Sequence, residues 1–396
     1  MNILFIIHNL GTKVPESRST LTEGGSEIFT YSIAHNMSKD HTCYILYPDL
    51  QQKGIKYLHK ISFFRNEFVG EYKEENTFIC ADNFRSILKD FNIDLIHYQH
   101  IIYNSLEYAI IGNSLGIPQI LSIHDYFYLC DEHFLENDKY VTCNVPTELS
   151  VCASCMTNKY NVDGSKVSLR RRVFKNFLKY MDEIIFSSDS VKSDYYKIFP
   201  EYSNKMDMIE IGVKTLPQVT KQKSDTFNIG IPSYITYIKG MIPLITTIRA
   251  LSNYSQIKFY LLCNMGDDKL RKFFSAYPNV VIAPYDWDKV DIIWLPTVAR
   301  ETYSMVASET LNRKIPLLVP SKGAFDTRFP KEIEGQIYKI NNPSNVENII
   351  NKILHLNLHK DIINNKRREV SPMPPQSIPF CSSQYESHYN NLLKKA

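Results

Sequence analysis

Short apolar runs recur along the whole chain, and each is followed by a polar loop and then by a segment with helical periodicity. Examples are Ile3–Ile7 and Thr42–Tyr47 in the first half, and Phe227–Ile231 and Pro316–Pro320 in the second half. Runs of this length are typical of buried strands, and repeated strand–helix units predict parallel, doubly wound sheets. With 396 residues, the chain is long enough for two such α/β domains, each with its own core.

The pattern starts twice, which predicts the domain boundaries. We expect an N-terminal Rossmann-like domain over residues 1–213, with a cysteine-bearing insertion at 130–155. The polar segment 214–226 contains Pro217 and is typical of an interdomain linker. A second Rossmann-like domain follows over 227–378, and residues 379–396 are expected to form a helix that returns to the N-terminal domain.

Composition excludes several classes of protein. A formal net charge of +3 does not favour bulk nucleic-acid binding, and no apolar run approaches the ~20 residues of a membrane-spanning helix. The segment Met1–His8 lacks the basic region of a signal peptide and is typical of a first buried strand. We therefore expect a cytoplasmic protein, whose cysteines are thiols or metal ligands before they are disulfides.

Two carboxylates, Glu301 and Glu309, lie at the start of a predicted helix between the apolar runs 291–296 and 314–319. This order places Glu301 and the first helical amides outside the carboxyl end of a parallel sheet, where α/β proteins bind ligands and phosphates. Eight helical positions rise about 12 Å. The spacing therefore suits an elongated ligand with hydroxyl groups near both ends and a diphosphate between them, as in a sugar nucleotide. The alternative interpretation is a solvated helix face.

Seven segments together resemble the retaining GT-B-fold glycosyltransferases of family 4, and the resemblance covers nearly the whole chain. They are Gly24–Glu27, Asp94–His100, Ser122–Tyr126, Phe186–Ser190, Ile209–Val213, Lys239–Gly240 and Glu301–Glu309. The resemblance implies two Rossmann-like domains facing a cleft. It also implies transfer of a hexose, with retained configuration, from a nucleotide-diphosphate sugar. The acceptor would be a glycan, a lipid-linked molecule or another glycoconjugate in surface polysaccharide biosynthesis.

The same resemblance assigns roles in the second domain. Glu301 is expected to contact the donor sugar, Glu309 the ribose hydroxyls, and Lys239 the diphosphate as its cation. The diphosphate would also meet the backbone amides of Thr302, Tyr303 and Ser304. Amide dipoles and an ammonium stabilise the leaving group where its charge develops, so no metal ion is expected in catalysis.

In the first domain the resemblance implies that His124 hydrogen bonds the donor sugar or the acceptor site, and that His100 lines the acceptor side. A structural role at a strand end is the alternative for both. Gly24 and Gly25 would let the backbone approach a ligand closely, although an ordinary turn explains them as well.

One departure from the family pattern concerns the phosphates. Ser233 and Tyr234 occupy the places where the family has Gly-Arg, and tyrosine supplies a hydrogen bond without a charge. This departure keeps two other functions open. One is a non-catalytic partner subunit or glycan-binding protein, and the other is a GT-B sugar-nucleotide epimerase.

The insertion and the segment after it carry two further features. Cys130, Cys143, Cys152 and Cys155 end in a Cys-x-x-Cys pair, which suits a tetrahedral structural zinc site. A subset of the resembled family has similar cysteines, while two disulfides or unlinked thiols are the alternatives. The basic amphipathic segment Arg170–Tyr180 is compatible with a helix that covers the sheet, with its arginines in water. It is also compatible with peripheral contact at the anionic inner face of the cell membrane.

Overall fold

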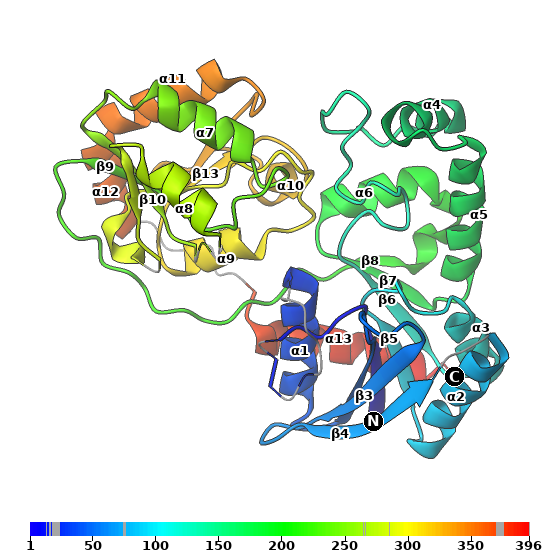
Figure 1. Cartoon of the computed structure of the whole chain (residues 1–396). Coiled ribbons are helices and arrows are strands. Elements are labelled where there is room, and N and C mark those ends of the chain that lie inside the picture. Colours follow the sequence, from blue (N-terminus) through cyan, green and yellow to red (C-terminus); the bar gives the residue numbers. More distant parts are fainter. Residues whose placement is uncertain are drawn as a thin grey trace. The chain divides into compact units, whose positions relative to one another are not determined.

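The computed structural model describes residues 1–396 except 13, 16, 18–23, 74–76, 264, 266, 285, 370–375 and 396, and except the side chains of 77–80 and 368–369. The chain divides into two compact units (Figure 1). The first comprises residues 1–133, 145–213 and 376–396, and the second comprises 134–144 and 214–375. Residues 134–144, from the predicted insertion, therefore group with the second unit.

The first unit is built on one eight-stranded sheet in the order β4-β3-β2-β1-β5-β6-β7-β8. Its strands are β1 (Asn2–Ile6), β2 (Thr42–Pro48), β3 (Ile55–Ile61), β4 (Glu67–Lys73), β5 (Leu95–Tyr98), β6 (Gln119–Ile123), β7 (Glu183–Phe186) and β8 (Met206–Met208). Neighbouring strands from β2 through β1 to β8 are parallel, and the side chains of β1 from Ile3 to Ile6 are fully buried. Strands covered on both faces are continuous apolar runs, which is why the sequence predicts them.

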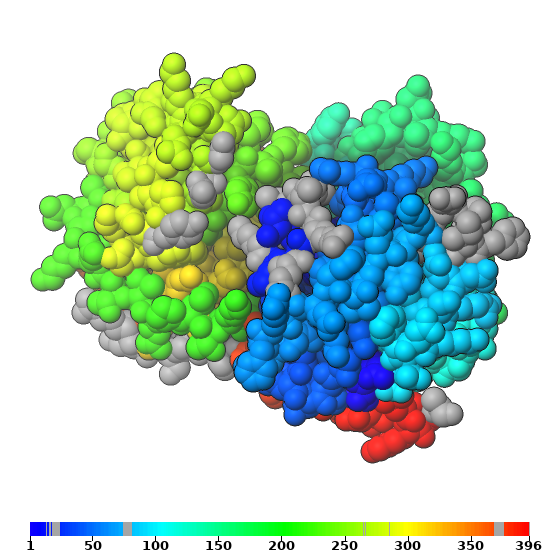
Figure 2. Space-filling view, turned by 60° about the horizontal axis from the view of Figure 1, so that its bottom comes forward, coloured from blue at the N-terminus to red at the C-terminus, as the bar shows by residue number. Residues whose placement is uncertain are grey.

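Strands β3 and β4 form an antiparallel extension of this sheet, which we did not predict. Strand β4 is mostly exposed or half-buried, and the surface view shows this segment (light blue) on the outside of the molecule (Figure 2). Its alternating, partly charged sequence lacks the apolar run by which the other strands are recognised. The first sheet is therefore mostly, but not wholly, parallel.

Helices flank the first sheet, and one of them comes from the C-terminus. They are α1 (Gly25–Met37), α2 (Thr77–Asp90), α3 (Glu107–Ser114), α4 (Leu149–Tyr160), α5 (Ser165–Lys179), α6 (Asp189–Ile198), the 3₁₀ turn η1 (Pro200–Lys205) and α13 (Ile378–Leu393). Helix α13 (red) packs against α1 (blue) (Figure 1). The Tyr389 hydroxyl lies 2.6 Å from His97 Nδ1, and the Tyr385 hydroxyl 2.9 Å from Ser122 Oγ. The C-terminal helix thus completes the core of the first unit.

The second unit contains a six-stranded, fully parallel sheet in the order β11-β10-β9-β12-β13-β14. Its strands are β9 (Phe227–Ile231), β10 (Ile257–Leu261), β11 (Val280–Ile282), β12 (Ile292–Trp294), β13 (Leu317–Pro320) and β14 (Ile337–Ile340). Its helices are α7 (Met241–Ala250), α8 (Asp268–Ser275), the turn η2 (Trp287–Lys289), α9 (Met305–Asn312), α10 (Ala324–Arg328), α11 (Val346–Leu358) and α12 (Lys360–Glu369).

Successive side chains of β12 point to opposite faces of the sheet and belong to two different hydrophobic clusters of the second unit. Ile292 and Trp294 pack with residues of α7 and α11, whereas Ile293 packs with residues of α9 and α10. A strand whose successive side chains both meet apolar clusters is covered by helices on two faces. The second unit is therefore doubly wound, and the predicted fold class, α/β with two parallel sheets, is confirmed.

Within the described residues, no helix combines the length and the apolar character needed to cross a membrane.

Candidate functional site

The sheet of the second unit changes winding direction between β9 and β12, and the loops after these two strands carry the predicted sugar-donor residues. Doubly wound sheets bind ligands at such a switch point, outside the carboxyl ends of the strands. Lys239 lies in the loop after β9 and Glu301 in the loop after β12. Lys239 Nζ lies 2.7 Å from Glu301 Oε1, with the lysine side chain 37% exposed and the glutamate 14% exposed. The fold thus joins two predicted residues that are far apart in the sequence.

A glycine allows the two loops to come this close. Gly240 has φ +88°, and a Cβ atom at this position would lie 2.0 Å from the carbonyl oxygen of Pro296. Next to it, the carbonyl of Ile238 accepts hydrogen bonds from the amides of Val298 and Ala299. Only glycine combines this dihedral angle with this contact at low cost.

The backbone around Glu301 is fixed from the loop after β13. The amide of Ala324 donates to the Glu301 carbonyl at 2.9 Å, and Gly323, with φ +60°, lets the two segments pack. The Thr297 hydroxyl donates to Glu301 Oε1 at 3.1 Å. Lys322 lies beside them, and burial, partly offset by Glu301 and reinforced by Arg300, lowers its pKa to about 8. The Glu301 carboxylate is therefore held in place by Lys239 and Thr297, and it also interacts electrostatically with Lys322.

The predicted diphosphate loop, Thr302 to Ser304, leads directly into α9. Ser304 has φ +70° and caps the helix, and the Ala307 amide donates to the Ser304 carbonyl at 3.1 Å. The first amides of a helix point out of its N-terminus. The ring of Tyr303 is buried, and its hydroxyl accepts a hydrogen bond from Ser308 Oγ. The positive end of the α9 dipole therefore lies at the predicted phosphate position.

Arg328 fixes this loop, and sequence reasoning did not find it. Its guanidinium lies 3.7 Å from the centre of the Tyr303 ring. It donates to the Tyr303 carbonyl at 2.5 Å and to Ser308 Oγ at 2.7 Å. An arginine that bridges both ends of a turn keeps the turn in one conformation. No local motif around Arg328 indicates this role, because its partners are about 20 to 25 positions earlier in the chain.

The other predicted donor-side residues occupy different environments. Glu309 lies in α9 and is half-buried; burial raises its pKa, against the lowering effects of Arg313 and Lys214. Burial of this carboxyl group does not fit the alternative of a solvated helix face. Ser233 and Tyr234 lie in the loop after β9, and Tyr234 is 59% exposed. The structure thus places both in the loop that contains Lys239.

The sheet of the first unit has its own switch point, between β1 and β5, and histidines gather there. His124 Nε2 lies 2.7 Å from Gln99 Oε1, and His100 Nε2 lies 3.2 Å from Asp125 Oδ2. The ring of His8, in the loop after β1, is 4.7 Å from the ring of His100. The structure thus brings the predicted His100 and His124 into one cluster and adds His8 and Gln99, which we did not predict.

Glu27 connects this cluster to α1. Its carboxylate accepts hydrogen bonds from the Gly24 amide at 3.0 Å and from Ser26 Oγ at 2.8 Å, and lies 3.1 Å from His8 Nε2. Burial opposes ionisation, but the bond and charge of His8, with the bond from Ser26, lower the pKa of Glu27 to about 2. Glu27 is therefore ionised near pH 7, and its carboxylate fixes the Gly24–Gly25 turn. The capping-box spacing, with a glutamate three residues after the cap, was the signal available in the sequence.

The buried histidines of the first unit differ in role. Burial, followed by the charge of His100, lowers the pKa of His124 to about 4, despite the opposing effects of Asp125 and Glu27. His124 is therefore neutral near pH 7 and can exchange hydrogen bonds with hydroxyl groups. His97 is fully buried between Ser122 and Tyr389, and burial lowers its pKa well below the ordinary value. The position of His97 inside the core indicates packing.

The predicted zinc ligands are divided between the units. Cys130, Cys152 and Cys155 belong to the first unit, whereas Cys143 belongs to the second. Among the residues that the structure describes, no group of three or more His, Cys, Asp or Glu side chains is arranged to hold a metal ion. Cys152 Sγ accepts a hydrogen bond from Arg171 Nη2 at 3.1 Å. The zinc site stays a prediction.

The predicted basic helix is α5, and two of its arginines are directed at protein groups. Arg170 lies over the rings of Phe127 and Phe174 and pairs with Asp131. Arg171 donates to the carbonyls of Pro146 and Thr147. Both guanidinium groups therefore contact other parts of the protein, contrary to our expectation that the arginines lie in water.

Comparison with known proteins agrees with this architecture. A glycosyltransferase from Rickettsia africae aligns with a TM-score of 0.65 and 14% identity, over 100% of this chain and 99% of that one. Sucrose-phosphate synthase from Thermosynechococcus elongatus gives 0.64 and 14%, over 100% of both chains. Anabaena HepE in complex with UDP-glucose gives 0.62 and 15%, over 99% of this chain and 100% of that one. At such identities the likeness establishes the fold, which is GT-B.

The sequence itself matches one family model. Residues 23–215 match the model of Glycosyltransferase Family 4. No curated protein matches the sequence.

Proposed function

We propose that the chain is a retaining glycosyltransferase that moves a hexose from a nucleotide-diphosphate sugar to a glycan, lipid-linked or glycoconjugate acceptor in surface polysaccharide biosynthesis. The observation that carries the proposal is the Lys239–Glu301 pair at the switch point of the second sheet, beside the N-terminus of α9. The family match of residues 23–215 supports the same class of reaction. HepE forms complexes with UDP and with UDP-glucose, which makes uridine-based sugars the first donors to test.

In the proposed reaction, the leaving diphosphate gains negative charge as its bond to the sugar breaks. The amides at the start of α9 and the ammonium of Lys239 are placed to stabilise that charge. A lysine ammonium has three N–H donors, and the bond to Glu301 uses one of them. Glu301 orients the ammonium and accepts from the sugar hydroxyls. This arrangement supplies the needed charge without a metal ion, in line with the proposed metal-independent catalysis.

On the acceptor side, we assign His124 and His100 to the binding of hydroxyl groups. The neutral imidazole of His124 both donates and accepts hydrogen bonds, which matches a hydroxyl group. The turn at Gly24 and Gly25, held by Glu27, would bring the backbone against the acceptor.

The test is binding and turnover with a panel of UDP-, GDP-, ADP- and dTDP-sugars, using the full chain. We expect one donor to bind by isothermal titration, and Glu301→Gln to weaken that binding about tenfold or more, the usual effect of losing a charged hydrogen bond. Glu347→Gln is the matched control, because Glu347 is exposed in α11 of the same unit. NMR of the product reveals whether the anomeric configuration is retained. Unchanged binding by Glu301→Gln would contradict the proposed donor site.

A non-catalytic partner subunit is the second candidate, and Tyr234 favours it. This exposed tyrosine stands where a phosphate-binding arginine is expected, so the site has one cation fewer. Donor binding without transfer or hydrolysis in the presence of many acceptors would favour this candidate. Isomerisation of the donor alone would instead identify an epimerase.

We also propose that α5 rests on the inner face of the cell membrane. Arg170 and Arg171 bind protein groups, but Lys166 and Arg172 remain in this helix, and Leu169 is 50% exposed. Flotation with vesicles containing anionic lipid at low salt tests the contact. Equal recovery with neutral vesicles would exclude an electrostatic contribution.

A further inference from the structure

A short segment from the first half of the chain, residues 134–144, belongs to the second compact unit, whereas the residues on either side of it belong to the first. We call this segment the strap. It is a small hairpin, in which Glu136 and Thr142 form an antiparallel bridge and the Cys143 amide donates to the Leu135 carbonyl at 2.7 Å. Leu135 is buried, with 2% of its surface exposed. The strap is therefore an ordered part of the second unit.

The sequence at the tip of the strap favours a tight turn. Asn137 Oδ1 accepts hydrogen bonds from the amides of Lys139 and Val141 at 2.9 and 3.2 Å. The Asn137 amide donates in turn to the Val141 carbonyl at 2.9 Å. Asparagine forms such side-chain turns readily. The strap thus keeps its shape through its own bonds, and separate contacts set its position on the second unit.

Hydrogen bonds join the strap to the loop between β12 and α9, which carries Glu301. Thr142 Oγ1 donates to the Val298 carbonyl at 3.2 Å, although the two residues are 156 positions apart in the sequence. The Arg300 amide donates to the Phe134 carbonyl at 3.4 Å. Both contacts lie just before Glu301 in the chain, so the strap supports the backbone that leads into this residue.

Lys322, in the loop after β13, connects the strap with the same loop. Its ammonium donates to the Val298 carbonyl at 2.6 Å and to Thr142 Oγ1 at 3.2 Å. Lys322 is half-buried, and burial lowers its pKa to about 8, so the side chain is mostly charged near pH 7. The Thr142 hydroxyl therefore accepts from an ammonium while it donates to a carbonyl. Valine has the same shape as threonine but can make neither bond.

The loop after β9 holds the Glu301 loop as well. The Ile238 carbonyl accepts hydrogen bonds from the amides of Val298 and Ala299 at 3.0 and 3.2 Å. Val298 thus donates to Ile238 through its amide and accepts from Thr142 and Lys322 through its carbonyl. A loop fixed in this way is held in one conformation, and a preorganised binding loop loses less entropy when its ligand binds.

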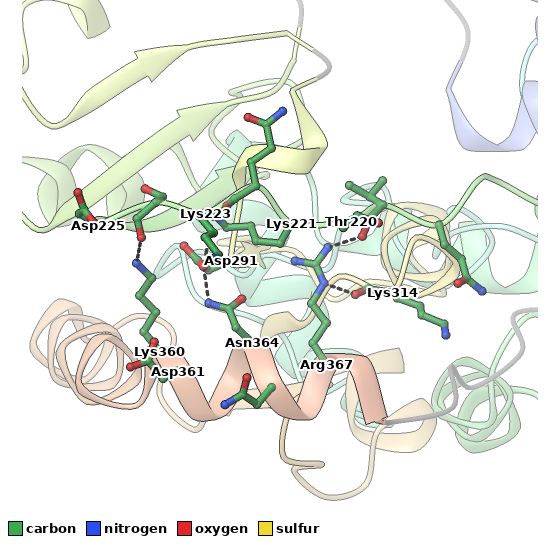
Figure 3. A pocket seen from close by; sticks show the side chains of 15 residues that line it. Thr220, Lys221, Lys223, Asp225, Asp291, Lys314, Lys360, Asp361, Asn364 and Arg367 are labelled. Carbon is green, nitrogen blue, oxygen red and sulfur yellow. Dashed lines mark hydrogen bonds and ion pairs between the residues drawn. The ribbon is translucent and has the colours of Figure 1, made fainter.

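The opposite edge of the second sheet is held by different residues (Figure 3). A pocket of about 750 Å³ lies there beside Asp291, which precedes β12, whereas Glu301 follows that strand. In this pocket Arg367 donates to backbone carbonyls, and Asn364 donates to Asp291 at 2.7 Å. These bonds connect α12 with neighbouring segments of the second unit. Support at the Glu301 end comes instead from the strap and from the loops after β9 and β13.

We propose that Thr142 and Lys322 are positioning residues of the sugar-donor site. Together with the strap, they hold the loop 297–301 in the conformation in which Glu301 meets the donor sugar. The role in donor binding rests on the proposed function, whereas the contact between strap and loop does not. A segment from the first half of the chain thus becomes part of the donor site in the second.

The first experiment is amide hydrogen exchange of the full chain without ligand, measured on peptides that span residues 297–301. Thr142→Val removes the hydroxyl, so these peptides should exchange about three- to tenfold faster, the effect of one net hydrogen bond. Thr142→Ser keeps the hydroxyl and should exchange at the wild-type rate. Thr246→Val is the matched control, because Thr246 is exposed in α7 and donates within its own helix.

The second experiment measures donor affinity and steady-state kinetics with the sugar nucleotide that the wild-type chain uses. Thr142→Val should raise the donor Kd and the donor KM about three- to tenfold, with the acceptor KM and the melting temperature unchanged. Thr142→Ser should restore both donor constants. Lys322→Met removes the two bonds of the ammonium and should have at least the same effect, whereas Lys272→Met, at an exposed lysine of α8, should have none.

The two experiments separate the contact from its role. Wild-type exchange rates in both Thr142→Val and Lys322→Met would overturn the contact between strap and loop. Faster exchange with unchanged donor affinity would overturn the positioning role. If no sugar nucleotide binds the wild-type chain, the proposed function fails and the role in donor binding fails with it. The exchange rates would then still support or refute the contact itself.

Discussion

Replacing Gly240 by alanine tests whether the close approach of the two switch-point loops in the second unit is required. The new methyl carbon would lie 2.0 Å from the Pro296 carbonyl oxygen, in a residue with φ +88°. The left-handed conformation costs a non-glycine residue about 1–2 kcal/mol, and overpacking adds about 1–3 kcal/mol. The lower entropy of alanine in the unfolded chain offsets about 0.4–1 kcal/mol. We therefore expect the second unit to lose about 2–4 kcal/mol of stability.

Tryptophan fluorescence isolates the unit concerned. Both tryptophans of the chain, Trp287 and Trp294, lie in the second unit, so their fluorescence during urea unfolding reports that unit. With a urea dependence of about 2 kcal/mol per molar, the midpoint should fall by about 1–2 M. The displaced loop would also move Lys239, so donor binding should weaken together with stability.

The control is Gly116→Ala in the first unit. Gly116 has φ +69°, but a Cβ atom there would meet nothing within 4 Å. In this variant alanine must adopt the left-handed conformation, but its methyl group meets no neighbouring atom. Circular dichroism should therefore detect that the unfolding free energy of the first unit falls by about 1 kcal/mol or less. If Gly240→Ala destabilised its unit no more than Gly116→Ala does, a steric requirement for glycine between the two loops would be refuted.

Four further predictions concern three single residues and one pair of cysteines. The pKa of Glu27 is lowered to about 2 in the folded chain, which corresponds to about 3 kcal/mol of stabilisation. This stabilisation is present above pH 4.5 and is lost as the pH falls toward 2. Glu27→Gln should therefore make the unfolding free energy of the first unit less dependent on pH between 4.5 and 2. The pKa of His124 is also lowered, so the contribution of its neutral ring to folding stability is lost as the pH falls from 6.5 through about 4. An NMR titration of the ring should show a midpoint near 4, and a midpoint near 6.5 would contradict its burial. Arg328→Lys loses the stacked, forked contact and should weaken donor binding about tenfold, with little change in melting temperature. If the zinc prediction holds, replacing Cys152 and Cys155 together by serine should abolish bound zinc in elemental analysis, while equal metal content in wild type and variant would exclude these ligands.

Local sequence patterns could predict the elements of the fold because most strands are covered on both faces. Such strands are continuous apolar runs, and each run recognised in the sequence corresponds to a parallel strand. Strand β4 of the antiparallel extension was missed for the opposite reason: it is partly solvated, so its residues alternate without an apolar run. Strand β3 is mostly buried, but Lys56, His59 and Lys60 interrupt its apolar residues. The Cys143 segment could not be assigned to the second unit, because its grouping depends on contacts between residues distant in sequence.

Site residues that directly follow a strand could be predicted from the sequence. Site residues that depend on contacts between separate loops could not be predicted. Lys239 and Glu301 each follow a strand, so a parallel sheet places both at its carboxyl edge, and the adjacency of β9 and β12 then brings them into contact. Arg328 and the His8–Glu27 pair follow no such rule. Each joins residues from separate loops or turns, and neither the spacing nor the residue types specify the partner in advance.

Charge distinguishes the two switch points and supports a division of labour between them. In the second unit, Lys239 and Lys322 lie close to Glu301, and Arg328 holds the positive end of the α9 dipole, so this site favours an anionic ligand such as a diphosphate. In the first unit, Glu27 and Asp125 are ionised beside a neutral His124, which suits hydroxyl groups better than phosphates. A phosphate brought to the first site would meet two carboxylates, and a carboxylate pair repels it. The charges therefore support the proposed assignment of the nucleotide-bearing substrate to the second unit and of the hydroxyl-rich acceptor to the first.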